Sequence, residues 1–184
     1  FVDNILIPDT LAVAGAFPQY YQLGRGCGDL IAYGVFDLNA AGTTKLLARG
    51  RWTDGTLQTV DPAQITEYVK YAWFTANSGN KPPASGVTEP YVDKPGAYTW
   101  DKAPRYLGKP HEAGALARMW VNGDYRNGIS AMDRVAARSL EAKKVADAMD
   151  TWLNQLVVGQ ATIANKAVPA TATSIGLTEA PRGA

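Results

Sequence analysis

The apolar positions of the chain follow two different spacings, which predict strands in one part and helices in another. The apolar and aromatic runs "LIAYGVFDL" at 30–38 and "KLLARGRW" at 45–52 flank "NAAGTT" at 39–44. Runs of this kind, separated by Gly, Asn and Asp, are typical of antiparallel strands joined by a turn. "YYQLG" at 20–24 has a similar character. The pattern therefore predicts a small antiparallel sheet of two or three strands.

Residues 61–76 combine helical spacing with a helix-start signal. Asp61 is a typical N-cap, Pro62 suits the first helical position, and Gln64 completes a capping box. Apolar residues then recur three or four positions apart, at Ile65, Tyr68, Val69, Ala72 and Trp73. This spacing predicts an amphipathic helix of about three turns.

The longest predicted helix covers about 129–158. Ser130 and Asp133 resemble a cap at its start, and Gly159 supplies a stop signal. One face carries apolar or small residues at alternating spacings of three and four, namely Met132, Val135, Ser139, Ala142, Ala146, Met149, Leu153 and Leu156. Such a helix is roughly 45 Å long at about 1.5 Å per residue. We expect it to need a long helical neighbour that the other segments do not supply.

Residues 77–111, called the strap below, show neither spacing. The first part is interrupted by prolines, at Pro82, Pro83, Pro90 and Pro95. Long irregular segments are uncommon in compact domains, and the aromatic residues Tyr91 and Tyr98 argue against disorder. The pattern favours an ordered strap that packs on something larger.

The predicted fold class is α+β: a helix-rich core with one long helix, a small antiparallel sheet and the Pro-rich strap. A helix is expected to end within "DTLAVAGA" at 9–16 after beginning before Phe1, and a short one is expected at "HEAGALARMW", 111–120. The chain is predicted as one domain over 1–184, made of a sheet region at 1–60, a helix at 61–76, the strap at 77–111, helices at 112–159 and a closing segment at 160–184.

Composition excludes several classes of protein. The 184 residues are 46% hydrophobic and 19% charged, which suits a folded domain rather than a disordered chain. A net charge of +1 provides no basic surface for nucleic acid, so nucleic acid is not expected as a partner. The sequence has no export signal and no apolar run of the roughly 18 residues that a membrane span requires.

One cysteine and one histidine limit the chemistry further. Cys27 has no partner for an intrachain disulfide, and Cys27 with His111 cannot supply the four ligands of a structural zinc. A Gly-x-Ser-x-Gly nucleophile elbow is missing, which argues against a hydrolase. We expect Cys27 to be a small buried hydrophobic residue and His111 to be structural or exposed.

Two long motifs resemble those of one enzyme family. "GAYTWDKAPRYLGKPHEAGALAR" at 96–118 resembles the central motif of the large subunit of nickel-iron hydrogenases, in which Lys-Ala-Pro-Arg-Tyr leads to Gly-Pro-Leu-Ala-Arg. "GLTEAPRGA" at 176–184 is similar to the later motif that carries the active-site arginine. The intervening segments at 23–37 and 60–74 match in the same order. Ala113 and Ala115 depart from the pattern without removing a chemical group.

The resemblance implies a parent enzyme that reversibly splits dihydrogen at a nickel-iron centre with carbonyl and cyanide ligands. In this family two Cys-x-x-Cys pairs hold the metals, and an iron-sulfur small subunit takes the electrons. Neither pair occurs in residues 1–184. The chain is therefore predicted as the central fragment of a larger helical-bundle subunit, completed by N- and C-terminal parts. Alone it is predicted to be inactive and to bind no nickel or iron.

The "APRG" turn at 180–183 carries the main candidate for the active site. The resemblance implies that Arg182 is a cation beside the nickel-iron site, held by the neighbouring Pro181 and Gly183. Because the chain stops within this Pro-Arg-Gly turn, we expect the turn to be internal in the parent. The other reading of Arg182 is an ordinary surface arginine, which the motif match disfavours.

Lys102, Arg105 and Arg118 belong to the central motif and are weaker candidates. They could line the active-site cavity or the subunit interface. The reading favoured here is that they form structural ion pairs that fix the strap, with Asp101 and Glu112 close in sequence.

The resemblance leaves a second functional class open. A relative in a respiratory complex could have lost the metal and retained a structural or quinone-reactive role. The match at Arg182 favours the hydrogenase, because a subunit without metal has less reason to retain that cation. Relatives with this central motif commonly lie in the periplasm, on the outer face of the cytoplasmic membrane.

Overall fold

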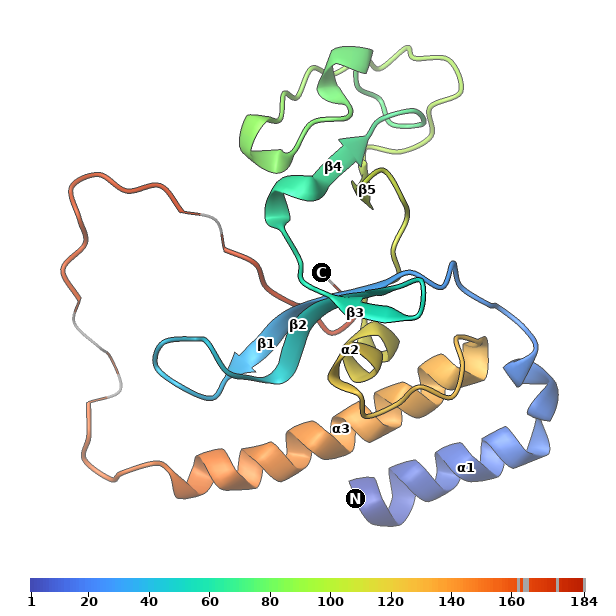
Figure 1. The fold of residues 1–184 in the computed structure, drawn as a ribbon, viewed down its shortest axis with the longest axis vertical. Coiled ribbons are helices and arrows are strands. Elements are labelled where there is room, and N and C mark those ends of the chain that lie inside the picture. Colours follow the sequence, from blue (N-terminus) through green and yellow to red (C-terminus); the bar gives the residue numbers. More distant parts are fainter. Residues whose placement is uncertain (162, 164–165, 175, 184) are drawn as a thin grey trace.

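The molecule is a stack of one small sheet and three helices, with a lobe projecting from the sheet (Figure 1). The computed structural model describes residues 1–161, 163, 166–174 and 176–183. The stack runs in the order sheet, α2 (Ala115–Asn122), α3 (Ala131–Asn154) and α1 (Ile7–Ala16). The lobe consists of residues 61–109 and is called the outer lobe below. None of the helices in the described part of the chain is long and apolar enough to cross a membrane.

The sheet confirms the predicted strand pair. β1 (Leu30–Asp37) pairs antiparallel with β2 (Lys45–Thr53), which continues into the short β3 (Thr56–Gln58). The side chain of Asn39 closes the predicted turn by accepting the backbone N–H of Thr43 at 3.0 Å. Inward-facing residues of both strands are fully buried, among them Leu30 and Leu47.

The strand predicted at 20–24 is wrong. Pro18–Tyr21 forms a short 3-10 helix, because a proline at the first position fixes a helical φ. The outer edge of β1 also has other partners. The backbone N–H of Ile31 bonds to the carbonyl of Glu112 at 2.9 Å, and that of Tyr33 bonds to the carboxylate of Glu179 at 2.6 Å.

The helix predicted at 61–76 is also wrong, although its start signal operates. Asp61 accepts the backbone N–H of Ala63 at 3.0 Å, but the helical segment is only a 3-10 turn, Pro62–Gln64. β4 (Ile65–Tyr68) follows and pairs antiparallel with β5 (Ala103–Tyr106), which belongs to the strap. A β ladder with a distant segment has replaced the local helical hydrogen bonds.

Strap residues also bond to backbone groups of residues 65–75 that would pair with one another in an α-helix. The ammonium of Lys94 donates to the carbonyls of Val69 and Phe74, at 2.5 and 2.9 Å. The backbone N–H of Trp73 bonds to the carbonyl of Thr99 at 3.0 Å. The strap thus wraps around residues 65–75 as part of the outer lobe, with 3-10 turns at Ala76–Ser78 and Pro83–Ser85. The outer lobe has a small buried cluster of its own, made of Val69, Ala72 and Phe74.

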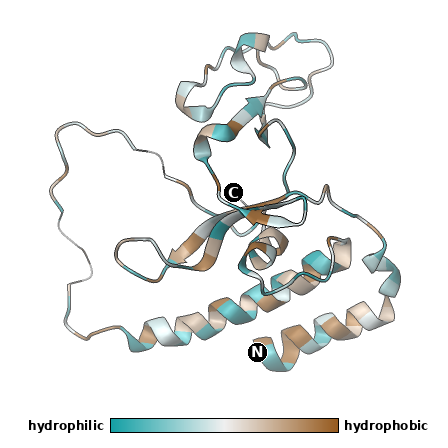
Figure 2. Cartoon of the chain, viewed as in Figure 1, coloured by the Kyte–Doolittle hydropathy of each residue, from teal (hydrophilic) through white to brown (hydrophobic). Residues whose placement is uncertain are grey.

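α3 begins at the predicted cap but is shorter than its predicted span of 129–158. Ser130 and Asp133 form a reciprocal capping box, in which the backbone N–H of Ser130 donates to Asp133 at 2.7 Å. The predicted apolar face is only partly buried. Val135 is 43% exposed and Met149 is 59% exposed, and the buried residues of α3 all lie in its first half, between Met132 and Ser139. Figure 2 shows apolar and polar residues alternating along α3, whereas α1 is mostly apolar.

The main core lies where α2 and α3 meet the sheet. Its members come from β2, α2, α3 and the turn between the helices, and they are Leu47, Leu116, Met119, Tyr125, Ala136 and Ala137. The short helix predicted at 111–120 corresponds to α2. The helix expected to end within 9–16 is α1, but it begins at Ile7 and not before Phe1; a π-helical turn at Val2–Leu6 precedes it. Packing in this core sets the orientation of α2, the helix that carries the candidate site.

Candidate functional site

The candidate site is built around one buried arginine on α2. Arg118 is 3% exposed, and its guanidinium faces α3. Its Nε and Nη2 donate to the two carboxylate oxygens of Glu141, at 2.5 and 2.9 Å. This parallel two-bond geometry is the strongest form of arginine–carboxylate pairing. Arg118 therefore joins α2 to α3.

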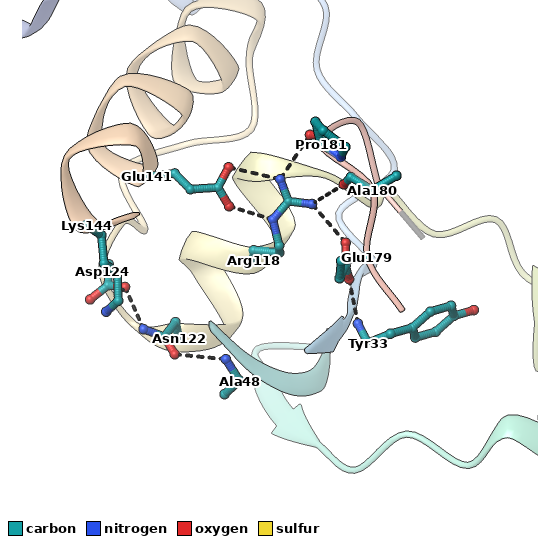
Figure 3. A network of polar contacts seen from close by, with 10 residues as sticks. All are labelled: Tyr33, Ala48, Arg118, Asn122, Asp124, Glu141, Lys144, Glu179, Ala180 and Pro181. Atoms are coloured by element: carbon teal, nitrogen blue, oxygen red, sulfur yellow. Dashed lines mark hydrogen bonds and ion pairs between the residues drawn. The ribbon is translucent and has the colours of Figure 1, made fainter. Parts of the chain in front are cut away.

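The same guanidinium binds a second carboxylate, from the C-terminal segment. Nη1 of Arg118 donates to Oε2 of Glu179 at 2.8 Å, and the Glu179 side chain is only 1% exposed. The other oxygen of Glu179 accepts the backbone N–H of Tyr33 on β1 at 2.6 Å. Glu179 thus connects α2 to the sheet edge (Figure 3).

Arg118 also holds the backbone of the turn that contains Arg182. Its Nη1 and Nη2 donate to the carbonyls of Ala180 and Pro181, both at 3.0 Å (Figure 3). The turn itself is closed by two bonds between the backbones of Ala180 and Gly183, at 2.9 and 3.0 Å. Arg118, Glu141, Glu179 and the turn at 180–183 are called the Arg118 junction below.

Two glycines allow this turn to approach α2 closely. A Cβ on Gly114 would lie 2.8 Å from the carbonyl oxygen of Arg182, and one on Gly183 would lie 2.9 Å from the Cβ of Ala113. Both glycines also have positive φ, 112° and 136°. Larger residues would be strained at either position and would push the turn away.

The electrostatics of the junction keep Arg118 charged. Burial by itself lowers the pKa of the guanidinium, but the hydrogen bonds and charges of Glu141 and Glu179 outweigh it, and the pKa rises above its ordinary value. The pKa of the nearby Tyr33 phenol is also raised, by burial first and by the charge of Glu179 second.

A cavity opens beside the junction, between β1 and the exposed half of α3. Its volume is about 550 Å³. The walls are mostly apolar, with residues such as Val35, Leu47 and Val145. The charged residues in the lining are Arg118, Arg138, Glu141 and Glu179. A largely apolar cavity with a few convergent polar groups is the usual form of a small-molecule site.

Arg182, the principal candidate from the sequence, lies on the exposed side of the turn. Its backbone is held as described, while its side chain is exposed and has no ion pair with any described residue. Pro181 contributes the carbonyl that Arg118 binds. The structure thus brings Arg182, Pro181 and Arg118 together. The last residue of the predicted motif, Ala184, lies outside the described residues.

Lys102 and Arg105 are elsewhere, in the outer lobe. Nζ of Lys102 lies 3.4 Å from a carboxylate oxygen of Glu67 and donates to the carbonyl of Val87 at 3.1 Å. Nη1 of Arg105 donates to the carbonyl of Pro104 at 2.7 Å, and the guanidinium lies 5.3 Å from the ring centre of Tyr68.

The ion-pair partners predicted from nearby sequence are wrong. Glu112 pairs with Arg134 instead, with both carboxylate oxygens engaged at 2.6 and 2.8 Å. The Asp101 side chain is bonded within its own turn, at Thr99. The actual partners of Arg118 are 23 and 61 residues away in sequence. Glu179 stands inside the quoted motif, whereas Glu141 gives no local signal.

Cys27 and His111 take no part in the junction. Cys27 is exposed rather than buried as expected, because its Sγ lies against the carbonyls of Asp29 and Pro110 at the surface. Burial lowers the pKa of the His111 imidazole. In the described ranges no group of three or more His, Cys, Asp or Glu side chains could hold a metal. A nickel-iron centre needs soft thiolate ligands, so these residues do not provide its ligand set.

Comparison with known proteins defines the class. The family model described as nickel-dependent hydrogenase matches residues 1–129, and the chain belongs to that family. The resemblance of the two sequence motifs to this family is thereby confirmed. The solved Ni-Fe-Se hydrogenase of D. vulgaris Hildenborough superposes with a TM-score of 0.91 at 33% identity, covering 100% of this chain and 43% of that one.

Two curated relatives illustrate the range of the match. The periplasmic [NiFeSe] hydrogenase large subunit of Desulfomicrobium baculatum is 32% identical over 209 residues, covering 100% of this chain and 41% of that protein. The Hydrogenase-1 large chain of Escherichia coli is 28% identical over 243 residues, with 100% and 40% coverage. The chain thus spans about two fifths of the length of these relatives.

Proposed function

We propose that this chain is the central part of the large subunit of a nickel-dependent hydrogenase, which reversibly splits dihydrogen into protons and electrons. The family membership supports the enzyme class. The observation that carries the proposal is the Arg118 junction, because it fixes the backbone of the motif that resembles the arginine-bearing motif of this family.

The proposed role of Arg182 is electrostatic. Its turn is rigidly held while its guanidinium remains exposed and free of described ion-pair partners. A cation carried on a turn that is held in this way can stabilise the negative charge that develops when dihydrogen separates into a proton and a hydride. The nickel-iron centre, with its carbonyl and cyanide ligands, would supply the bond-breaking chemistry. Its thiolates would come from parts of the parent outside these residues.

The same proposal covers partners, location and the remaining basic residues. An iron-sulfur small subunit would receive the electrons, and the parent would be periplasmic like the relative from D. baculatum. Lys102 and Arg105 would brace the outer lobe rather than take part in turnover, because their contacts lie within that lobe. The isolated 184-residue chain would bind no stoichiometric nickel and would have no activity.

The test uses the complete parent polypeptide matured together with its small subunit. We expect dye-linked oxidation of dihydrogen by the wild type. Replacing Arg182 by lysine should lower kcat by about 10²- to 10³-fold while nickel content is retained. Arg126→Lys, at an exposed arginine distant from the turn, is the matched control.

Three outcomes are informative. A metal-loaded wild type without turnover would contradict the hydrogenase proposal and favour a structural or quinone-reactive relative. An Arg182→Lys enzyme with full kcat would contradict the role of the cation. Equal losses in the Arg182 and Arg126 variants would assign the effect to general damage.

A further inference from the structure

We infer that Glu179 and Glu141 are positioning residues, which act through Arg118 to hold the turn that presents Arg182. This inference rests on the proposed function, in which Arg182 is the functional cation. It concerns one carboxylate inside the motif at 176–184 and one without a local sequence signal, and it assigns them a role distinct from general stability.

Arg118 has no spare donor. A guanidinium carries five N–H groups. In this structure one goes to Glu141 from Nε, two from Nη1 go to Glu179 and Ala180, and two from Nη2 go to Glu141 and Pro181. Three donors fix the guanidinium and two hold the turn. A displacement of either carboxylate therefore changes where the turn is held.

The two carboxylate oxygens of Glu179 bind different groups. One accepts the backbone N–H of Tyr33, and the other accepts Nη1 of Arg118. Glutamine would retain the shape but would face one of these two donors with its own NH₂ group. Glu179→Gln should therefore release either the sheet edge or Arg118. Since Glu179 directly precedes Ala180, that release acts on the turn itself.

Replacing Glu141 by glutamine should loosen the turn in the same way but more weakly. Among the described residues the Glu141 carboxylate bonds only to Arg118 and makes no hydrogen bond to the turn. Glutamine at this position retains one acceptor for Nε or Nη2 and loses the other. Its side chain is 13% exposed, so water can replace part of the loss. The geometry therefore predicts an ordered series in which Glu179→Gln exceeds Glu141→Gln.

The chain offers a closely matched control. Glu112 and Arg134 form the same two-bond pair, at 2.6 and 2.8 Å, between the segment before α2 and the start of α3. The remaining contact of Arg134 is the carbonyl of Gly24, at 2.6 Å, and not the turn. Glu112→Gln therefore removes an ion pair of the same geometry, with an arginine side chain that is 31% exposed against 4% for Arg118, without acting on Ala180 or Pro181.

The experiment compares Glu179→Gln, Glu141→Gln and Glu112→Gln in the complete, metal-loaded enzyme with its small subunit. Hydrogen exchange followed by mass spectrometry measures the peptide containing the backbone N–H groups of Ala180 and Gly183, which close the turn. Steady-state kinetics measures kcat and KM for dihydrogen, and nickel content is determined for each variant.

We expect Glu179→Gln to accelerate exchange in this peptide about tenfold or more and to lower kcat about 10- to 100-fold, with nickel content and KM retained, because small displacements of a catalytic group carry such penalties. Glu141→Gln should give smaller changes in the same direction. Glu112→Gln should leave both quantities within about twofold of the wild type.

The possible failures are separable. Unchanged exchange in both Glu179→Gln and Glu141→Gln would overturn the inference, as would equal effects of Glu112→Gln. Faster exchange with an unchanged kcat would overturn the link to Arg182. If Glu179→Gln does not assemble, Glu141→Gln alone decides the matter. If the wild type does not turn over dihydrogen, the proposed function fails. The positioning role then fails with it, even if hydrogen exchange shows that the carboxylates hold the turn in place.

Discussion

The Arg118 junction and the outer lobe use basic residues from the same sequence motif in opposite ways. Arg118 is 3% exposed and joins α2 to α3, the sheet edge and the C-terminal segment. Lys102 and Arg105 bind groups of their own lobe, such as Glu67 and Tyr68. The difference shows that residues of one motif can join very different numbers of chain segments, and we expect their substitutions to differ accordingly.

Burial explains why the two regions should respond differently to substitution. Removing one partner of a buried ion pair leaves a charge without solvent or counter-ion, which costs several kcal/mol. In the outer lobe the partner of Lys102 is Glu67, whose side chain is 32% exposed, so water can solvate the carboxylate that is left behind and the loss costs less. Substitutions in the two regions therefore test the comparison directly.

The largest effect is expected for Arg118→Met. It leaves the carboxylates of Glu141 and Glu179 unpaired and frees two carbonyls, so the free energy of unfolding should fall by about 3–5 kcal/mol. Urea unfolding followed by tryptophan fluorescence measures the change. The double variant with Glu141→Met should lose less than the sum of the two single changes. A decrease in the free energy of unfolding of less than about 1 kcal/mol would contradict the expected difference between the Arg118 junction and the outer lobe.

A smaller effect is expected for Lys102→Met in the outer lobe. Methionine retains an apolar stem but loses the ammonium, which lies 5.3 Å from the ring centre of Phe74 and contacts Glu67 and Val87. The expected cost is about 1–2 kcal/mol, and it should be confined to the lobe. Limited proteolysis should show faster cleavage in the strap and unchanged cleavage in α3. Cleavage that accelerates equally in both would contradict a local role.

Acid should weaken the start of α3, which lies in the helical stack beside the junction. Burial by itself would raise the pKa of Asp133, but hydrogen bonds from Ser130 and Tyr125 outweigh it and hold the pKa below its ordinary value. A lowered folded pKa adds stability above the unfolded pKa of about 3.9, and this stability is lost as the pH falls below that value. Unfolding measured at decreasing pH should show a loss that is smaller in Asp133→Asn. Identical pH profiles would exclude Asp133 as the source.

The smallest effect is expected for Arg105→Ala. Its guanidinium is partly exposed and bonds only to the neighbouring carbonyl of Pro104 and the ring of Tyr68. The free energy of unfolding should change by about 0.5 kcal/mol or less, and turnover per nickel in the parent enzyme should be unchanged. Thermal unfolding together with a nickel-normalised assay measures both. Lost turnover at normal yield would place Arg105 in the functional machinery.

The elements that could be predicted from the sequence are those set by short-range patterns. The strands at 30–38 and 45–52 and the capping box at Ser130 depend on neighbours a few residues away. The segment at 61–76 shows the limit of this approach. Its cap at Asp61 forms as predicted, yet pairing with β5, about 40 residues further along the chain, decides the conformation that follows.

The candidate site divides in the same way. The motif containing Arg182 could be recognised because its residues are adjacent in the chain and resemble a known pattern. The acidic partners of Arg118 could not, because Glu141 and Glu179 reach it only after α2, α3 and the sheet have packed together. Nearby sequence suggested Glu112, which the fold assigns to Arg134.

The sequence by itself determined the family, the capping signals, the main strands and the position of the exposed arginine, since each is encoded in contiguous residues. Only the tertiary structure decided which carboxylates neutralise Arg118, which segment pairs with β4, and how closely the turn at 180–183 approaches α2. The physical reason is that a buried charge must be paired by whatever group the packed fold brings within hydrogen-bond distance. That distance in space bears little relation to distance along the chain.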